Sequence, residues 1–431
     1  MKLAILAGGK GTRLGRSDLP KPMIEVHGKP VLEWQIELAR RHGLTDISLL
    51  TGHLAPVIQD YFGDGSSLGV SITHVVEPVP LGSAGAVLQL RERLDERFML
   101  FYGDTVMDID LDRLIAFDRQ QHSLATLVVH PNDHPFDSDL VEADSDGVIS
   151  RFLSKPHPPG LFYRNLVNAA LYILDPDIFS CIPTDGPSDF GRDIFPAALA
   201  SGKRLRAYCT PEYIKDMGTP DRLEHVQSDF ARGQVSGRSL RTPRPAFFLD
   251  RDGVINKEVG NLSDIDAFEL LDGVPEAIRL VNAAGFLAVV VTNQPVLAKG
   301  FLSVDGLHAI HNKMETLLGA RRAYLDAIYY CPHHPDKGFP GEVPELKRVC
   351  DCRKPQPGMI LQAARDFSID LTRSYMIGDQ PRDIQAGKQA GVQTVLIASA
   401  APANDAPPAT LRPDFVFPTL ETAVRALLER P

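Results

Sequence analysis

Short apolar runs alternate with longer amphipathic stretches along this chain, and the alternation starts afresh in its second half. In the first half the apolar runs lie at 3–7, 46–50, 70–76 and 98–102, and the amphipathic stretches lie at 31–42, 54–62 and 83–94. This rhythm is typical of strands and helices that alternate in a parallel sheet. We therefore predict an α/β fold.

The second half repeats the rhythm independently. Its predicted strands are 246–250, 286–292, 326–330, 374–378 and 393–397, and its predicted helices are 274–284, 304–318, 357–366, 381–390 and 419–429. Between the halves lies "ARGQVSGRSLRTPRPA", a polar, basic stretch with two glycines and two prolines, which disfavour helix and central strand. We predict two Rossmann-like domains, at 1–232 and 246–431, joined by a linker at 233–245.

The composition of the chain limits the classes of partner that the protein can bind. A chain of 431 residues is long enough for two or three domains with their own cores. The formal net charge of −10 argues against nucleic acid and anionic membranes. No apolar run approaches the roughly 20 residues of a membrane span, and "MKLAILAGG" reaches glycine before a signal-peptide core could form. We expect a cytoplasmic protein with reduced cysteines, and a homo-oligomer remains open.

The first predicted strand runs into a glycine-rich turn, "LAILAGGKGTRLG". Glycines let backbone N–H groups approach a phosphate, and the interleaved Lys10 and Arg13 could neutralise its charge. The turn is neither a Walker A loop nor a G-x-G-x-x-G fingerprint. Taken alone, it fits a phosphate-binding turn and an ordinary tight turn equally well.

Six further motifs follow in order: "PKPMIEVHGKPVLEW", "EPVPLGSAGAV", "YGDTVMDID", "FLSKP", "NAALYIL" and "DMGTP". With the glycine-rich turn they resemble the sugar-phosphate nucleotidylyltransferases over roughly residues 1–230. The resemblance implies a nucleotide-diphospho-sugar transferase fold and a reaction between a nucleoside triphosphate and a sugar 1-phosphate. Two departures, Ser154 and Ala170, stand where the family often has an acidic residue and a glycine.

The resemblance also implies roles for individual residues. Those expected on the nucleoside triphosphate are Gly8, Gly9, Gly11, Thr12, Arg13 and, against the α-phosphate, Lys21. Asp104 and Asp216 would share Mg²⁺, and Lys155 and Asn168 would bind the sugar phosphate. The residues expected to face nucleotide or sugar are Glu77, Gly82, Ser83 and Gly85. Joining two anions requires cations and a metal that offset their repulsion and stabilise the departing pyrophosphate, which is consistent with these roles.

The second half opens with "FFLDRDGVIN", an apolar strand that ends in Asp250-x-Asp252-Gly253. Later predicted strands end in "VVVTNQ" and "YMIGDQPRD", so Thr292, Asp379 and Asp383 should converge on the same edge of the sheet. A lone D-x-D-G would fit a calcium loop or a turn. With these strand ends and "RKP", the set resembles the haloacid-dehalogenase-type phosphohydrolases over residues 245–431.

By that resemblance Asp250 is the nucleophile, and Asp252 protonates the leaving group and then activates water. Thr292 and Lys354 clamp the transferred phosphoryl group. Mg²⁺ is expected on Asp379, Asp250 and the backbone of Asp252. An anionic nucleophile meets an anionic phosphate only if metal and lysine neutralise the charge, which agrees with this set.

Cysteine spacing points to a second metal. "YYCPHHPD" and "CDCRKP" supply three thiolates and one imidazole, a tetrahedral structural zinc set made of Cys331, His333, Cys350 and Cys352. His334 is the neighbouring alternative to His333, and free buried cysteines are the alternative to a zinc site. Zinc in this loop would fix Arg353 and Lys354, which directly follow Cys352. Cys181 and Cys209 have no such partners and are predicted to be ordinary apolar residues.

The zinc loop narrows the resemblance to the D-glycero-D-manno-heptose-1,7-bisphosphate 7-phosphatases, with histidinol-phosphate phosphatase as a near relative. It implies substrate contacts from Glu258 to Asn261 and from Asn293. Two departures are Pro295 in place of a serine after "TNQ" and Gln380 in place of a lysine after "GD". The lost lysine weakens the expected grip on a second phosphate and leaves Arg353 as the second cation.

Together the two halves predict a bifunctional enzyme of nucleotide-sugar synthesis for a surface glycan such as lipopolysaccharide. By resemblance the phosphatase yields heptose 1-phosphate, and the transferase joins it to GMP from GTP to give GDP-heptose. Two alternatives remain open. One keeps both folds but uses hexose 1-phosphate and another phosphomonoester, such as histidinol phosphate. The other makes the first half a nucleotide-sensing module that regulates the phosphatase.

Overall fold

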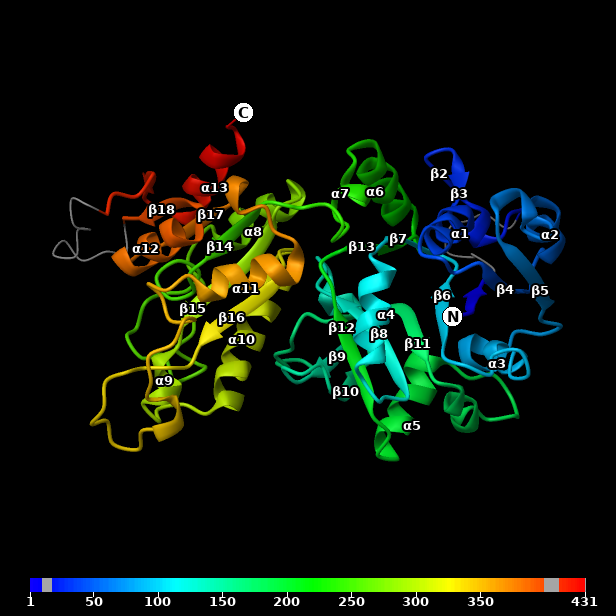
Figure 1. Ribbon diagram of the computed structural model, residues 1–431, viewed down its shortest axis with the longest axis horizontal. Coiled ribbons are helices and arrows are strands. Elements are labelled where there is room, and N and C mark those ends of the chain that lie inside the picture. The colour runs from blue at the N-terminus through cyan, green and yellow to red at the C-terminus, as the bar shows by residue number, and fades with distance from the viewer. Residues whose placement is uncertain (10–17, 399–410, 431) are drawn as a thin grey trace. The chain divides into compact units, whose positions relative to one another are not determined.

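The computed structural model describes residues 1–9, 18–398 and 411–430 (Figure 1). Contacts divide the chain into two compact units. Unit 1 comprises Met1–His130, Ser138–Lys155 and Leu166–Ser239, and unit 2 comprises Pro131–Asp137, Pro156–Asn165 and Leu240–Pro431.

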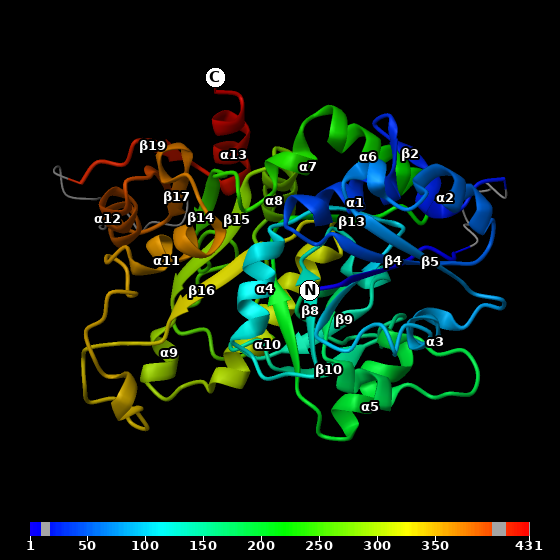
Figure 2. The same cartoon turned by 45° about the vertical axis from the view of Figure 1, so that its right-hand side comes forward.

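A nine-stranded sheet forms the centre of unit 1. Its strands are β1 (Leu3–Leu6), β4 (Asp46–Thr51), β5 (Ser71–Val76), β6 (Phe98–Tyr102), β8 (Ala125–His130), β9 (Leu140–Ala143), β10 (Ile149–Leu153), β11 (Val167–Leu174) and β12 (Leu205–Cys209). β1 is parallel to both β4 and β6, and β4 and β5 lie side by side at one edge (Figure 2). The four strands predicted in this half are therefore confirmed.

The sheet of unit 1 is nevertheless mixed, whereas the rhythm of the sequence predicts a parallel one. β11 runs antiparallel to β6 and β8, and β9 and β10 form a further antiparallel pair. Antiparallel strands need no crossover helix, so they leave no strand–helix alternation in the sequence.

The helices of unit 1 are α1 (Val31–Arg41), α2 (Ala55–Phe62), α3 (Gly82–Leu88), α4 (Leu111–Arg119), α5 (Phe195–Ala200), α6 (Pro220–Ala231) and α7 (Gln234–Gly237). α3 is shorter than the predicted 83–94, because the chain after Leu88 turns through three-residue hydrogen bonds such as Arg93 N to Leu90 O at 2.9 Å. α7 lies inside the predicted linker, and its Val235 is buried against Val226 and Met217. The expectation that this stretch contains no helix was wrong at its start.

Side chains alternate between two cores on the faces of this sheet. Leu3 and Ile5 of β1 pack with α1, α2 and α4, whereas Ala4 packs on the opposite face with α3 and α5. Burial on both faces explains why the parallel strands read as continuous apolar runs. Two short pairs complete the unit: β2 (Glu25–Val26) with β3 (Lys29–Pro30), and β7 (Thr105–Asp108) with β13 (Tyr213–Asp216).

Unit 2 contains a parallel sheet of six strands in the order β16-β15-β14-β17-β18-β19. The strands are β14 (Ala246–Leu249), β15 (Leu287–Asn293), β16 (Ala327–Cys331), β17 (Tyr375–Gly378), β18 (Gln393–Ile397) and β19 (Phe415–Phe417). The helices are α8 (Val274–Ala283), α9 (Pro295–Ala298), α10 (Val304–Gly319), α11 (Gly358–Phe367), α12 (Pro381–Ala390) and α13 (Leu420–Leu428). Every strand and helix predicted in this half is present, with bounds within two residues of the prediction.

The strand order of unit 2 determines where a ligand can bind. β14 is flanked by β15 on one side and β17 on the other, so the connections leave it in opposite directions (Figure 1). Crevices at such switch points lie beyond the carboxyl ends of the strands. The residues that follow β14 and β17, Asp250 and Asp379, therefore meet beside Thr292 of β15.

In the described ranges no helix is long and apolar enough to cross a membrane.

The core around β14 provides a stability test. Phe248 of β14 is fully buried on the face of the sheet that α11 and α12 cover. Phe248→Ala should therefore cost about 3–5 kcal/mol of unfolding free energy. Hydrogen exchange of the β14 and β17 amides in urea measures this loss. Phe301→Ala is the matched control in the same unit, because Phe301 is 44% exposed. Equal losses for the two variants would contradict the packing described here.

Candidate active sites

The carboxyl end of β14 presents a buried carboxylate. Asp250 is only 4% exposed, and its backbone N–H donates to Ile377 O at 2.9 Å. One carboxylate oxygen, Oδ1, accepts from the backbone N–H of Arg251 at 2.8 Å. The other, Oδ2, lies 2.8 Å from Lys354 Nζ. Burial raises the pKa of Asp250, and the neighbouring Lys354 opposes that shift.

Lys354 is the buried cation of this site, with 2% of its surface exposed. Its Nζ lies between Asp250 Oδ2 at 2.8 Å and Asp383 Oδ1 at 2.7 Å. Burial alone would lower the pKa of Lys354, but the two carboxylates outweigh it and the net shift is upward. The side chain of Asn293 fixes the backbone of Lys354, accepting from its N–H and donating to its carbonyl, both at 2.9 Å.

Three carboxylates, from Asp250, Asp379 and Asp383, each bring an oxygen within 4.8 Å of the others. Burial, followed by the charges of Asp250 and Asp383, raises the pKa of Asp379 to about 7. Gly253 adopts a φ of +80°, and a Cβ there would collide with the Asp379 carboxylate, so only glycine leaves room for it. Carboxylate oxygens are ligands that Mg²⁺ prefers, and the donor set therefore fits that ion.

The second aspartate of the motif, Asp252, is held apart from this group. Its two oxygens accept from Arg251 at 2.8 and 2.9 Å, and Asn256 Nδ2 and Gln294 Nε2 donate to it at 3.0 and 2.9 Å. Gln294 Nε2 also donates to Thr292 Oγ1 at 3.0 Å. These contacts orient Asp252 and Thr292 together without making the Asp252 side chain part of the carboxylate group.

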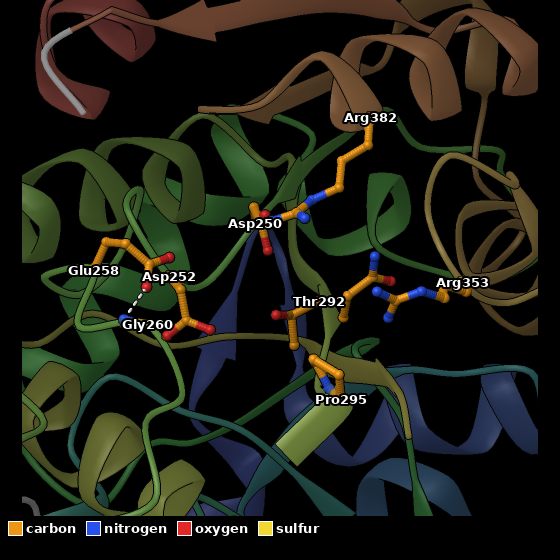
Figure 3. Close-up of a pocket in the computed structure, with 9 residues that line it drawn as sticks. Asp250, Asp252, Glu258, Gly260, Thr292, Pro295, Arg353 and Arg382 are labelled. Carbon is orange, nitrogen blue, oxygen red and sulfur yellow. Dashed lines mark hydrogen bonds between the residues drawn. The ribbon is translucent and has the colours of Figure 1, made fainter. Parts of the chain in front are cut away.

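A pocket opens over these residues (Figure 3). It is lined by Asp250, Asp252, Glu258, Gly260, Thr292, Asn293, Pro295, Arg353 and Arg382. Burial raises the pKa of Glu258, whose carboxylate accepts from the backbone N–H of Gly260. Asn261, expected on the substrate, does not line the pocket, and its Oδ1 accepts from Lys299 Nζ at 3.1 Å.

The predicted zinc ligands come together at the end of β16. The Sγ atoms of Cys331, Cys350 and Cys352 lie 3.2–3.5 Å apart, and His333 Nδ1 lies 3.4 Å from Cys352 Sγ and 3.7 Å from Cys331 Sγ. Zn–S bonds of about 2.3 Å and Zn–N bonds of about 2.0–2.1 Å in a tetrahedron give edges of about 3.5–3.8 Å. The side chains therefore fit one zinc ion with little adjustment. Hydrogen bonds, the largest from Cys331, lower the pKa of Cys352 to about 5.

The cluster selects between the two adjacent histidines. His333 is in it, whereas His334 accepts from the backbone N–H of Asp336 at 3.2 Å and packs edge-on against Phe339. The cluster is also tied to the pocket. Gln294 N donates to Cys331 O at 2.8 Å, and Arg353 Nη1 donates to His333 O at 3.1 Å.

In unit 1, β7 and β13 place Asp104 next to Asp216. Asp216 is in register with Thr105, and Met217 N donates to Asp104 O at 3.2 Å. Asp104 forms an ion pair with Lys21, which begins the 3-10 turn Lys21–Met23. Both oxygens of Asp216 accept from Arg222 Nη1, at 2.9 and 2.8 Å.

Each of the two expected metal carboxylates of unit 1 is therefore already paired with a cation. Burial alone would raise the pKa of Asp216, but Arg222, Gly218 and Lys21 outweigh it, so the net shift is downward. The Asp216 carboxylate is therefore stabilised in its charged form, and a divalent cation would compete with Arg222 for its oxygens.

The start of the glycine-rich turn lies against Glu77. A Cβ at Gly8 would stand 3.3 Å from Glu77 Oε1 and 3.4 Å from Gly52 N. Burial raises the pKa of Glu77, whose Oε2 accepts from Leu81 N at 3.3 Å. Among the described residues, none would lie within 4 Å of a Cβ at Gly9. Gly11, Thr12 and Arg13 lie outside the described residues.

The other expected contacts of unit 1 fall into two places. Gly82, at φ +74°, and Gly85 approach the backbone of Ser188, while Ser83 Oγ donates to Asp189 Oδ1 at 3.2 Å. Asn168 lies close by, because a Cβ at Gly191 would stand 3.5 Å from its Nδ2. Lys155 is exposed, and its backbone N–H donates to Asp139 at 3.1 Å.

The alanine that replaces a family glycine has a structural consequence. Ala170 adopts φ +54° at a β-bulge of β11, and its N–H donates to Asn168 Oδ1 at 3.3 Å. Left-handed backbone is uncommon for residues with a Cβ. The register shift lies between Asn168, which still pairs with Val129 of β8, and Tyr172, so Ala170 falls in the irregular segment.

Several residues of the two sites had no assigned role in the sequence analysis. Asp383 positions Lys354, Arg222 neutralises Asp216, Asn256 and Gln294 orient Asp252, and Arg382 lines the pocket. Asn256, Gln294, Arg382 and Asp383 lie in the motifs "FFLDRDGVIN", "VVVTNQ" and "YMIGDQPRD", and Arg222 lies two residues after "DMGTP". The motifs place these residues near the site, but only side-chain geometry gives each a partner.

Comparison with known proteins agrees with this geometry. Residues 2–233 match the nucleotidyl transferase family, and residues 351–423 match the HAD-hydrolase-like family. D-glycero-beta-D-manno-heptose-1,7-bisphosphate 7-phosphatase of Escherichia coli K12 is 44% identical over 184 residues, which are 42% of this chain and 93% of that protein.

Two solved structures are also similar. HddC of Yersinia pseudotuberculosis, complexed with GMP-PN, is 25% identical over 53% of this chain and 99% of that one, with a TM-score of 0.46. D,D-heptose 1,7-bisphosphate phosphatase of B. bronchiseptica, complexed with magnesium and phosphate, is 34% identical over 43% and 98%, with a TM-score of 0.37. The chain thus belongs to the nucleotidyl transferase family and, by a separate match, to the family of the heptose-bisphosphate 7-phosphatases.

Proposed function

We propose that this chain catalyses two steps of GDP-heptose synthesis. Unit 2 removes the 7-phosphate of D-glycero-D-manno-heptose 1,7-bisphosphate, and unit 1 transfers GMP from GTP to the resulting heptose 1-phosphate with release of pyrophosphate. The observation that carries the proposal is the buried Asp250–Lys354–Asp383 arrangement, in a chain that belongs to both families.

In the phosphatase reaction Asp250 attacks the phosphorus of the 7-phosphate, an Asp250–phosphate bond forms, and the bond from phosphorus to the sugar oxygen breaks. Asp252 protonates that oxygen as it leaves. Asp252 then takes a proton from the water that attacks the phosphorus, which releases phosphate and restores Asp250. Gln294 and Asn256 hold Asp252 in place for both transfers.

Lys354 and Thr292 bind the phosphoryl group while it moves. The ion pair with Asp383 leaves the ammonium of Lys354 fixed, so little reorganisation is required as charge develops. Asp250 and Asp379, with the Asp252 carbonyl, would hold Mg²⁺. That ion, when bound, supplies charge neutralisation between the carboxylate and the phosphate.

The cysteine–histidine cluster is proposed to hold structural zinc. Cys350 and Cys352 precede Arg353 and Lys354 directly in the chain, so a closed tetrahedral site would limit the motion of both cations. Asn293 adds a second restraint through the backbone of Lys354.

In unit 1, Asp104 and Asp216 would share Mg²⁺, and Lys21 would move from Asp104 to the α-phosphate. Gly8 and Gly9, with Gly11, Thr12 and Arg13 from outside the described residues, would line the triphosphate. Glu77, Gly82, Ser83 and Gly85 would face the nucleotide or sugar, and Asn168 and Lys155 the sugar phosphate. The preference for guanine rests on the family resemblance, and the cytoplasm is the proposed location.

The chemistry of the intermediates favours phosphatase action first. The anomeric phosphate left by the phosphatase is the nucleophile that a sugar-1-phosphate nucleotidylyltransferase requires. A second phosphate dianion at C7 would be repelled on binding to the transferase site, because the chain has a formal net charge of −10. The two alternatives are hexose 1-phosphate with another phosphomonoester, and a nucleotide-sensing first half. The presence of two metal carboxylates, Asp104 and Asp216, supports catalysis over sensing.

The proposal is tested by giving the whole chain heptose 1,7-bisphosphate, GTP and Mg²⁺ and following products with time. Phosphate should appear before pyrophosphate, because dephosphorylation precedes transfer. Asp250→Asn should lower phosphate release by at least about three orders of magnitude, yet still form GDP-heptose when heptose 1-phosphate is supplied. Replacement of GTP by CTP, UTP or dTTP should slow transfer.

Asp216→Asn serves as the reciprocal variant, with phosphate release retained and transfer lost. Conversion of the bisphosphate directly to a nucleotide sugar by Asp250→Asn would refute the order of reactions. Loss of both activities in either folded variant would refute two independent sites.

The zinc proposal predicts one tightly bound zinc per chain, measured by elemental analysis of freshly purified, reduced protein. Cys352→Ser should lose the zinc and lower phosphatase kcat, because Lys354 is then less restrained, while nucleotidyl transfer is unchanged. Cys181→Ser, in unit 1 and outside the cluster, is the matched control and should keep both. Protein that contains no zinc, or a Cys352→Ser variant with full phosphatase activity, would contradict the proposal.

A further inference from the structure

The pocket of unit 2 contains more positive charge than the transfer of one phosphoryl group uses. Lys354 is buried beneath the pocket between Asp250 and Asp383. Two guanidinium groups, from Arg353 and Arg382, line the pocket (Figure 3). A site for a simple phosphomonoester would need no further pair of cations around the substrate.

The two arginines differ in their exposure and in whether protein groups already bind their guanidinium N–H donors. Arg353 is half-buried, and its Nη1 donates to His333 O at 3.1 Å. Arg382 is exposed and belongs to the first turn of α12, from which it extends toward Asp250 (Figure 3). Within residues 1–9, 18–398 and 411–430, no carboxylate forms an ion pair with Arg382, although its neighbour Asp383 pairs with Lys354. Its planar set of N–H donors therefore remains available to a ligand.

The neighbouring residues show why the charge lies at this position. Gln380, where a lysine is expected, has no charge, and its Nε2 lies 3.4 Å from Asp379 Oδ2. Arg382 is two residues further on in the same turn and restores one positive charge to the pocket. Guanidinium groups bind phosphate in a bidentate manner, which a lysine cannot do.

We infer that Arg382 binds the phosphate that is not transferred, so that the phosphatase site selects bisphosphorylated sugars over monophosphates. The inference rests on the proposed function, in which the 7-phosphate is cleaved and the anomeric phosphate stays on the sugar. With the 7-phosphate at Asp250, the anomeric phosphate must lie elsewhere along the pocket, whose lining includes the exposed Arg382. Arg382 is thus a specificity-determining residue, and Lys354 and Thr292 remain the groups on the transferred phosphoryl group.

The test compares two substrates of the full chain, heptose 1,7-bisphosphate and heptose 7-phosphate, which lacks the anomeric phosphate. Arg382→Gln should raise KM for the bisphosphate by about 10- to 150-fold, the range of a charge-assisted hydrogen bond, with kcat nearly unchanged. For heptose 7-phosphate neither constant should change. Arg382→Lys should recover part of the loss. Arg373→Gln, exposed at the opposite end of β17, is the matched control and should behave as the native chain.

Equal losses of kcat/KM on both substrates would overturn the inference, because Arg382 would then act on the transferred phosphoryl group or on the fold. Unchanged KM for the bisphosphate would overturn it as well. Should the native chain not hydrolyse heptose 1,7-bisphosphate, the proposed function fails. The same variants are then compared on a panel of sugar bisphosphates and their monophosphates. If Arg382→Gln does not weaken the preference for bisphosphates on this panel, the inference is refuted independently of the proposed function.

Discussion

The phosphatase site depends on one buried ammonium group held between two buried carboxylates. Lys354 Nζ lies 2.8 Å from Asp250 and 2.7 Å from Asp383, and all three side chains are almost fully buried. An unpaired charge at this depth would be strongly destabilising, so each of the three requires the others. The same pairing opposes the rise in the pKa of Asp250 that burial causes, and it fixes the carboxylate in position for an incoming phosphate.

The surrounding structure holds that lysine in place from several directions. Asp383 comes from the first turn of α12, Asn293 grips the backbone of Lys354 from the end of β15, and the cysteine–histidine cluster precedes it in the chain. The strand order of unit 2 makes this possible, because β14, β15 and β17 are neighbours and end at one edge. Arg382 leaves the same turn as Asp383, so one helix start contributes to both the reaction and substrate selection.

Sequence reasoning predicted most of this framework, and the reasons differ between elements. The predicted strands of unit 2 alternate with helices, so these elements could be predicted closely. The antiparallel strands of unit 1 have no such rhythm and were not predicted. Asp250, Thr292, Asp379 and the four proposed zinc ligands stand in recognisable motifs at strand ends or cysteine pairs. Arg382 lies in one of these motifs and Arg222 just beyond another, but their roles could not be predicted, since they depend on which carboxylate or open pocket a long side chain reaches.

The central claim, that Lys354 enables Asp250 to act as a nucleophile, is tested most directly by capture of the phosphoenzyme. The chain is mixed with heptose 1,7-bisphosphate and Mg²⁺, quenched within milliseconds and reduced with borohydride, which converts an aspartyl phosphate to homoserine. Peptide mass spectrometry should find homoserine at position 250, and none in a folded Lys354→Met variant whose metal content equals that of the native chain. Phosphate release without modification of Asp250, or equal modification in the Lys354→Met variant, would contradict the account.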